Sequence, residues 1–262
     1  MKFWNNFFKR LYGSPIRPPV HPLRIALGRI KKDSFDSRDY KVKTILFNGS
    51  IPENYSLKSF VKQVKNQGSI GSCGAHAYTT ALEILFNMRN DTVELSELFH
   101  YYVTREIEGT VSLDDGMELR NGAKALAEQG VCFETQHAYH PLLFDVEPTN
   151  LARITAQWLT IKEYRRVNSF EEIKQCISQG LPVVIGMRVD NKFFADKTGD
   201  IKRLSDTLLG GHAVCVAGYD KDRIEIVNSW GQSWGNQGFA WLHKNFVEKA
   251  LIDAWVVIPR WL

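Results

Sequence analysis

The residue with the clearest chemical potential is Cys73, which lies in the stretch V-K-N-Q-G-S-I-G-S-C-G-A-H-A-Y-T-T-A from Val64 to Ala81. Glycine and small polar residues precede the cysteine, and apolar residues follow it at three- and four-residue steps: Ala75, Tyr78, Ala81, Leu82 and Leu85. The pattern predicts a loop that delivers Cys73 to the first turn of a buried helix. The N-terminal end of a helix stabilises a thiolate, the nucleophilic form of cysteine.

A cysteine nucleophile needs a base within hydrogen-bond reach and a third group that orients the base. Among the seven histidines, His212 opens a predicted strand and Asn228 closes the next one. A simple hairpin centred on Asp220 places these two residues nearly opposite each other, with Cβ atoms about 4.5 to 5.5 Å apart. The Asn228 amide oxygen then accepts from the imidazole. Taken singly, each of the three residues is more often structural than catalytic.

The elements that must position these residues follow from periodicity. Helical stripes cover residues 94–106 and 117–129, and Gly130 is a suitable C-cap. After Trp158 one more helix is predicted at 170–178. Strands rich in Val and Ile then follow, separated by turn residues, at 182–189, 212–219, 223–228, 239–243 and 254–258. A helical half followed by an antiparallel sheet predicts an α+β chain of two lobes with a ligand cleft between them.

The composition is that of a globular chain. Its 262 residues, 44% hydrophobic and 12% aromatic, bury a substantial core. The formal charge of +4 comes without a basic run interleaved with aromatics, so nucleic acid is not an expected partner. The sequence contains no run of about 18 apolar residues, so no transmembrane helix is predicted. We expect a monomer. The four cysteines and the lack of a secretory-signal pattern favour free thiols in the cytoplasm or another reducing compartment, with secretion by a non-standard route still open.

The first fifty residues are predicted to be an extension to a domain at 51–262, itself divided into a helical lobe at about 51–157 and a β lobe at about 158–262. Residues 1–12 place Phe3, Trp4, Phe7, Phe8 and Leu11 on one helical face. Such a short segment can lie on a membrane surface, dock on another protein or fold back on its own domain, and the last is favoured. Four prolines within residues 13–22 predict an extended spacer.

The chain resembles the papain-like cysteine peptidases from about Ile51 to Ile258. The resemblance is carried by I-P-E-N-Y, Q-G-S-I-G-S-C-G-A-H-A, L-S-E-L, G-G-H-A-V-C-V-A-G-Y-D and I-V-N-S-W-G-Q-S-W-G-N-Q-G-F. It implies a peptidase that hydrolyses polypeptide substrates through a thioester on Cys73, without metal or cofactor. His212 is implied as general base and later acid, and Asn228 as the residue that holds its imidazole. Gln67 and the Cys73 backbone N–H are implied as oxyanion-hole donors.

The same resemblance implies which residues form the substrate cleft: Asp115, Gly116, Met117, Gly186, Gly211, Trp230 and Trp234. Asp115 and Gly116 stand where relatives often carry two glycines that pair with substrate backbone. Met117 and Gly186 are the expected lining of the main side-chain pocket, and Trp230 is expected to cover the His212–Asn228 hydrogen bond. The chain departs from the family at Ile70, where relatives often have a disulfide cysteine, and at Gly74, commonly a tryptophan, which is expected to leave space beside the thiol.

Relatives are commonly made as precursors, so residues 1–50 are hypothesised to occlude the cleft as an intramolecular inhibitor of a zymogen, helped by the high effective concentration that a short tether gives. Two other functions remain open on the same scaffold. One is a catalytically silent peptide-binding or regulatory protein, and the other is an acyl transferase or isopeptidase. A metal site is not expected, because Cys132, His137 and His140 lack a fourth ligand and fit no trusted zinc spacing.

Overall fold

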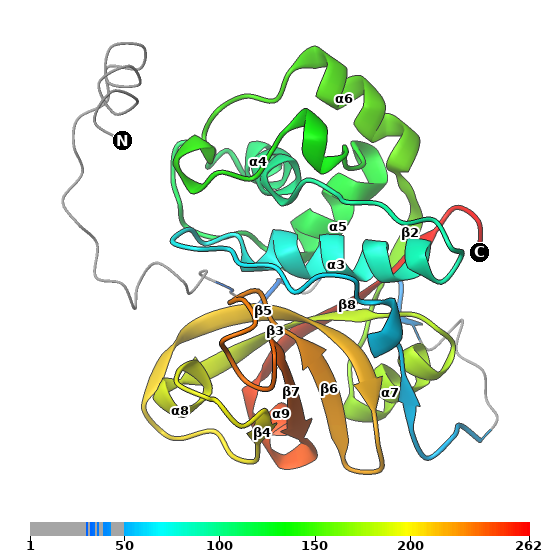
Figure 1. The fold of residues 1–262 in the computed structure, drawn as a ribbon, viewed down its shortest axis with the longest axis vertical. Helices are drawn as coiled ribbons and strands as arrows, with labels where there is room; N and C mark the ends of the chain where they lie inside the picture. The colour runs from blue at the N-terminus through cyan, green and yellow to red at the C-terminus, as the bar shows by residue number, and fades with distance from the viewer. Residues whose placement is uncertain (1–29, 31, 35, 37–38, 43–49) are drawn as a thin grey trace.

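The computed structural model describes residues 30, 32–34, 36, 39–42 and 50–262. The predictions for residues 1–12 and for the proline spacer at 13–22 fall outside these residues. The described chain forms two lobes, with helices gathered in one and a sheet in the other (Figure 1). This is the α+β arrangement that the sequence predicts. Within the described part of the chain, no helix is long and apolar enough to cross a membrane.

The helical lobe contains α3 (Cys73–Asn87), α4 (Glu97–Glu108), α5 (Leu119–Glu128) and α6 (Asn150–Ala156). Helix α3 lies where the two lobes meet (Figure 1) and buries nearly its whole circumference. Such a helix needs small residues on several faces, and alanines and Gly74 supply them close to its start. Short 3₁₀ turns at 58–60, 134–136, 141–143 and 157–159 complete the connections.

Local sequence signals fix the ends of these helices. Helix α4 begins at Glu97 because the Ser96 side chain accepts a hydrogen bond from the Phe99 backbone N–H at 3.0 Å. It ends at Gly109, whose φ of 67° is left-handed. The predicted C-cap Gly130 also has a positive φ, and a Cβ there would stand 1.9 Å from the Ala156 carbonyl oxygen. Only glycine fits at that position.

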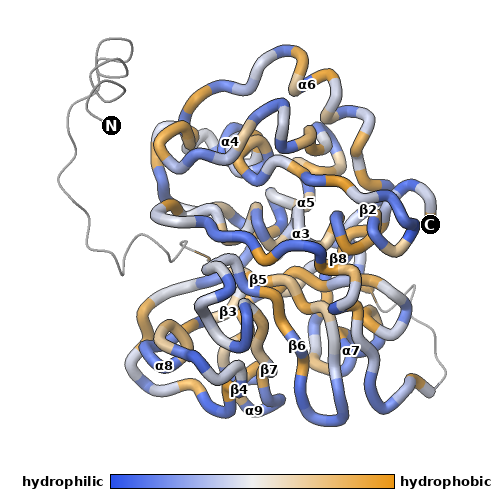
Figure 2. The backbone as a smooth tube through the Cα atoms, in the orientation of Figure 1, coloured by the Kyte–Doolittle hydropathy of each residue, from blue (hydrophilic) through white to orange (hydrophobic). Residues whose placement is uncertain are grey.

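The eight-stranded sheet has the order β2-β8-β3-β5-β6-β7-β4, with β1 (Tyr55–Ser56) paired to β5. Its other strands are β2 (Ile161–Arg166), β3 (Val183–Asp190), β4 (Asp200–Ile201), β5 (Leu208–Tyr219), β6 (Arg223–Val227), β7 (Phe239–His243) and β8 (Leu251–Pro259). All these pairs are antiparallel except β4 with β7. The apolar central strands stand out against the hydrophilic outer loops (Figure 2).

Three more helices accompany the sheet: α7 (Phe170–Ser178), α8 (Asn191–Phe194) and α9 (Lys244–Ala250). The predicted helix at 170–178 and all five predicted strands are present. Strand β2 was missed because its sequence, I-K-E-Y-R-R, is largely charged and only its first residue is buried. Residues 40–42 join the sheet beside β2, since the Arg166 N–H donates to the Tyr40 carbonyl at 2.9 Å and Val42 is fully buried.

Candidate active site

Cys73 is the first residue of α3, as its sequence context predicts, and its side chain is fully buried. The loop before it is held on both sides. The Gln67 backbone N–H donates to the Ser229 carbonyl at 2.8 Å, and the Gly71 N–H donates to Asp114 Oδ1 at 2.8 Å. The thiol therefore stands at a fixed helix N-terminus, where unpaired N–H groups favour a thiolate.

His212 lies within β5 and Asn228 follows β6, and their side chains are joined by a 2.8 Å hydrogen bond between Nε2 and Oδ1. The simple hairpin register expected for them is wrong. Cys215 pairs with Val227, and the register shifts between Val216 and Gly218. A bulge of this kind changes which residues face each other. Continuing the ladder by one step brings Asn228 level with Val214, two residues from His212, so the pair meets diagonally on one face of the sheet.

The hydrogen bonds of Asn228 determine the tautomer of His212. Asn228 Oδ1 also accepts from the Ser229 backbone N–H at 2.8 Å, which identifies this atom as the amide oxygen. Nε2 of His212 must then carry the hydrogen, and the lone pair of the neutral ring sits on Nδ1. That Nδ1 is buried without a hydrogen-bond partner among the described residues. It is the ring atom that can accept a proton from a thiol.

His212 is neutral over most of the pH range in this structure. The ring is fully buried, and burial lowers its pKa to about 4, although the hydrogen bond with Asn228 opposes the shift. A buried imidazole cannot easily hold the positive charge that a thiolate–imidazolium pair requires.

An aromatic wall covers this pair. The Trp230 ring stacks on the His212 imidazole with centroids 4.3 Å apart and an interplanar angle of 26°. Phe193 and Trp234 lie behind it, and Trp234 Nε1 donates to the Phe193 carbonyl at 2.9 Å. Trp230 therefore lies over His212, as the resemblance implies, whereas Trp234 is a buried support for that wall.

Gln67 is fully buried beside the nucleophile loop. Its Oε1 accepts from Ser229 Oγ at 2.7 Å and its Nε2 donates to the Ile70 carbonyl at 2.9 Å. These two bonds fix the plane and the orientation of the amide. Ser229 is also the neighbour of Asn228, so the amide of Gln67 and the orienter of His212 are attached to one loop.

Ile30 packs against Gly186 and Gly211, the second of which is the neighbour of His212, although no sequence motif points to Ile30. A Cβ added to Gly211 would stand 2.7 Å from the Ile30 carbonyl oxygen and 3.0 Å from its backbone nitrogen. A Cβ added to Gly186 would stand 2.6 Å from Ile30 Cγ2 and 3.0 Å from Leu119 Cδ1. Both glycines predicted to line the cleft therefore make room for this residue, which is 6% exposed.

The other predicted cleft residues are divided between surface and interior. Asp115 is exposed, and the buried Gly116 has a φ of 82° that favours glycine. Met117 is buried, with its sulfur 3.1 Å from where a Cβ on Gly74 would stand. The expectation of free space beside the thiol is thus wrong, because Met117 fills the volume that a larger side chain at Gly74 would take. Asp114 Oδ1 bonds to the loop before Cys73.

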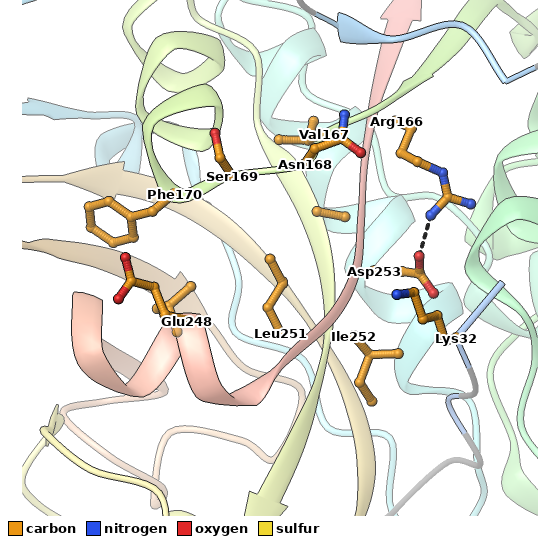
Figure 3. A pocket seen from close by; sticks show the side chains of 12 residues that line it. Lys32, Arg166, Val167, Asn168, Ser169, Phe170, Glu248, Leu251, Ile252 and Asp253 are labelled. Atoms are coloured by element: carbon orange, nitrogen blue, oxygen red, sulfur yellow. Dashed lines mark hydrogen bonds and ion pairs between the residues drawn. The ribbon is translucent and has the colours of Figure 1, made fainter. Parts of the chain in front are cut away.

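Asp33 is the centre of a second group of contacts that the sequence did not reveal. Its backbone N–H donates to Asp253 Oδ2 at 2.6 Å, and its Oδ2 accepts from Trp255 Nε1 at 2.9 Å. Arg166 joins Asp253 and Asp39, and Figure 3 shows its guanidinium directed at the Asp253 carboxylate beside a pocket of about 400 Å³. We call this group the Asp33 anchor, made of Asp33, Asp39, Arg120, Arg166, Asp253 and Trp255. An acidic residue inside the apolar run L-I-D-A-W-V-V-I was the available signal.

Burial, together with the charge of the neighbouring Asp253, raises the pKa of Asp33 to about 6, although Trp255 and the arginines Arg120 and Arg166 oppose the shift. All four cysteines are buried, and none of them forms a disulfide. Among the described residues, no three His, Cys, Asp or Glu side chains are grouped so as to hold a metal ion.

Fold and site together define a thiol peptidase scaffold. The model of the papain family cysteine protease matches residues 51–260, and the chain belongs to this family. It is 32% identical over 212 residues to an uncharacterised peptidase C1-like protein of Acanthamoeba polyphaga mimivirus, covering 73% of this chain and 68% of that protein. With mouse cathepsin K it shares 27% identity over 222 residues, covering 80% and 66%. The chain thus spans about two thirds of these curated relatives.

Solved structures agree with the family assignment. Xylellain, a cysteine protease from Xylella fastidiosa, superposes with a TM-score of 0.82 at 28% identity, covering 94% of this chain and 99% of that one. The predicted papain-like α+β fold and the assignment to the cysteine peptidases are confirmed.

Proposed function

We propose that the chain hydrolyses peptide bonds, with Cys73 as nucleophile, His212 as base and acid, and Asn228 as the residue that orients the imidazole. The observation that carries the proposal is the His212–Asn228 hydrogen bond, which leaves Nδ1 as the proton-accepting atom of a base on the strand facing α3. A nucleophile at a helix N-terminus and an oriented imidazole are the parts that thiol catalysis requires.

The reaction follows from these parts. Nδ1 of His212 takes the Cys73 proton, and the thiolate attacks the peptide carbonyl carbon. The Cys73 backbone N–H and the Gln67 amide stabilise the oxyanion. The C–N bond then breaks as the imidazolium gives its proton to the leaving amine. Water, deprotonated by His212, attacks the thioester, and the carboxylate product leaves with the thiol restored.

A panel of fluorogenic peptides separates this function from its alternatives, with the Cys73→Ala protein as blank. A peptidase releases fluorophore in water alone and forms a free carboxylate product, identified by mass spectrometry. Product that forms only when a primary amine is added would instead favour an acyl transferase. Peptide bound stoichiometrically but left intact would favour a binding protein on this scaffold.

We further propose that the chain itself closes the predicted substrate cleft, with Ile30 as the blocking residue. Ile30 contacts both Gly186 and Gly211, and the latter is the neighbour of His212. Cys73 and His212 are both fully buried in this arrangement. A substrate carbonyl has to reach the thiol, so the segment at Ile30 must leave before a peptide can bind.

The Asp33 anchor holds Ile30 in place, since it lies only three residues further along the chain. Asp33 and Asp39 connect the extension to Arg120 of the helical lobe and to Arg166 of the β lobe. Partly buried ion pairs with several charges are more persistent than isolated surface pairs. The anchor therefore bridges both lobes across the closed cleft.

The anchor predicts that closure tightens in acid. The pKa of Asp33 is about 6 when docked against an unperturbed 3.8, so docking binds a proton and is favoured as the pH falls below 6. At pH 7.5 the buried Asp33 carboxylate faces Asp253, and docking is weaker. We expect the kcat/KM of the parent chain, relative to that of Asp33→Asn, to rise about tenfold or more between pH 4.5 and pH 7.5.

The catalytic titrations cancel in this ratio, because both proteins carry the same Cys73 and His212. Peptide cleavage measured at half-unit pH steps gives the ratio directly. A ratio that stays constant over this range would show that Asp33 does not control closure.

A further inference from the structure

The carbonyl of Ser72 accepts two hydrogen bonds from one residue, His76. The His76 backbone N–H donates at 3.1 Å, as expected for the first turn of α3. The ring nitrogen Nδ1 of His76 lies 3.0 Å from the same oxygen. This carbonyl belongs to the peptide group whose N–H is that of Cys73. Any bond to the oxygen therefore acts on the nitrogen that is proposed to stabilise the oxyanion.

The hydrogen atoms in this group can be assigned from its partners. Tyr139 OH donates to the Gln67 carbonyl at 2.8 Å, so its single hydrogen is used. Ser72 Oγ, 2.6 Å from Tyr139 OH, must then be the donor in that pair. His76 Nδ1 lies 3.3 Å from Ser72 Oγ as well as near the Ser72 carbonyl, and both are acceptors toward it. Nδ1 of His76 therefore carries the hydrogen.

The result is a directed chain of hydrogen bonds from His76 through Ser72 and Tyr139 to the Gln67 main chain. At one end, His76 Nδ1 donates to the Ser72 carbonyl of the Cys73 peptide group and to Ser72 Oγ. At the other end, Tyr139 holds the main chain of Gln67, the residue whose side-chain amide is the second proposed oxyanion donor. Consecutive hydrogen bonds polarise one another, and a carbonyl that accepts a bond makes its peptide N–H a stronger donor.

The surroundings of His76 keep its imidazole neutral, with the hydrogen on Nδ1. The residue is 2% exposed, and burial lowers its pKa, although the charge of Glu97 opposes that shift. Lys65 pairs with Glu97 and lowers the pKa of His76 further. The His76 ring also meets Tyr139 edge-on, with centroids 4.8 Å apart. The imidazole is thus neutral, with one tautomer and one orientation.

We propose that His76 is a positioning residue for the oxyanion site, which fixes and polarises the Ser72–Cys73 peptide group and links it through Tyr139 to Gln67. The inference rests on the proposed hydrolytic function, and it adds a residue that acts on transition-state charge without touching substrate. Removing a whole oxyanion donor costs about 10² to 10³ in kcat. Loss of the bond from His76 Nδ1 to the Ser72 carbonyl, which only supports the Cys73 N–H donor, should lower kcat by less, about tenfold.

The test compares His76→Phe with His76→Asn in the full-length protein. Phenylalanine keeps a flat ring but removes the N–H, and we expect kcat for peptide cleavage to fall about tenfold with KM changed less than about twofold. The side chain of asparagine carries an N–H₂ donor at the branch position that Nδ1 occupies in histidine. His76→Asn should therefore recover most of the kcat that His76→Phe loses. Tyr139→Phe, which cuts the link to Gln67, should also lower kcat.

Two controls separate positioning from folding. The first is His100→Phe, because His100 is an equally buried histidine of the same lobe that lies outside this chain of hydrogen bonds. Its kcat should match the parent. The second is the rate of Cys73 alkylation by iodoacetamide, a reaction that forms no oxyanion. That rate should be unchanged in His76→Phe.

An unchanged kcat in His76→Phe, or an equal fall in His76→Asn, would overturn the inference while leaving the proposed function intact. A parallel loss of alkylation and of kcat would also overturn it, since the damage would then lie in the nucleophile. Absence of Cys73-dependent hydrolysis in the parent protein would instead overturn the proposed function, and this inference with it.

Discussion

Replacing Cys73 or His212 with alanine should reduce kcat for peptide cleavage by about 10⁴-fold or more, because residues that act as one unit lose nearly the whole rate together. Cys73→Ala removes the atom that forms the thioester. His212→Ala removes Nδ1, the ring atom left to accept the proton once Nε2 is bound to Asn228. The double variant should be no slower than either single one.

Matched controls are available for both substitutions. Cys176 is also a buried cysteine outside any disulfide, but it lies in α7, and Cys176→Ala should keep its activity. His243 is the last residue of β7 and is hydrogen-bonded to Asp200, and His243→Ala should also keep its activity. Cleavage that survives in Cys73→Ala would contradict the proposed nucleophile.

Asn228→Ala should have a smaller effect, about 10- to 10²-fold, because the base remains but its tautomer and orientation are no longer fixed. The pH profile of kcat/KM is the decisive measurement here, since an imidazole freed from Asn228 loses the hydrogen bond that opposes the lowering of its pKa. A variant indistinguishable from the parent in both rate and pH profile would remove Asn228 from the mechanism.

Replacing Ile30 with aspartate in the full-length chain should raise kcat/KM at pH 7.5 by at least about tenfold. Burying an isoleucine side chain stabilises the docked form by about 1.5 to 3 kcal/mol, and a carboxylate in the same apolar site would cost more. The docked segment therefore releases, and the substrate gains access to Gly186 and Gly211. The measurement is steady-state cleavage of a peptide that the parent protein already accepts.

Ile154→Asp is the control for this substitution, because Ile154 is an isoleucine of α6 that is 54% exposed. Its activity should equal that of the parent. Equal activity of the Ile30→Asp and parent proteins would contradict closure by Ile30. This point variant is a sharper test than deletion of residues 1–50, since deletion would also remove the fully buried Val42.

Release of Ile30 should also change the base. The pKa of His212 is about 4 because the ring is buried, so admission of water to the cleft should raise it. The proposed closed form would thus disfavour catalysis in two ways, by excluding substrate and by keeping the imidazole neutral. Both effects would have one cause, which is the Ile30 segment that fills the site and keeps water from it.

The sequence by itself determined the parts of this protein that depend on short stretches of chain. The periodicity after Cys73 specified α3, the helical stripe at 94–106 indicated α4, and the Val- and Ile-rich runs specified the central strands. The three separated motifs around Cys73, His212 and Asn228 were enough to identify the family. Each of these signals lies within a few helical turns or one strand, so it can be interpreted without knowing what packs against it.

Only the tertiary structure decided which distant residues meet. The Asp33 anchor joins residues 220 positions apart, and Ile30 reaches glycines of β3 and β5. The bulge between Val216 and Gly218 shifts the pairing of β5 with β6 away from the register that a symmetric turn predicts. Met117 fills the space at Gly74 because packing leaves no void there. These four features have the same physical reason. Long-range packing depends on the shapes of both segments that meet, whereas the local sequence pattern describes only one of the two segments.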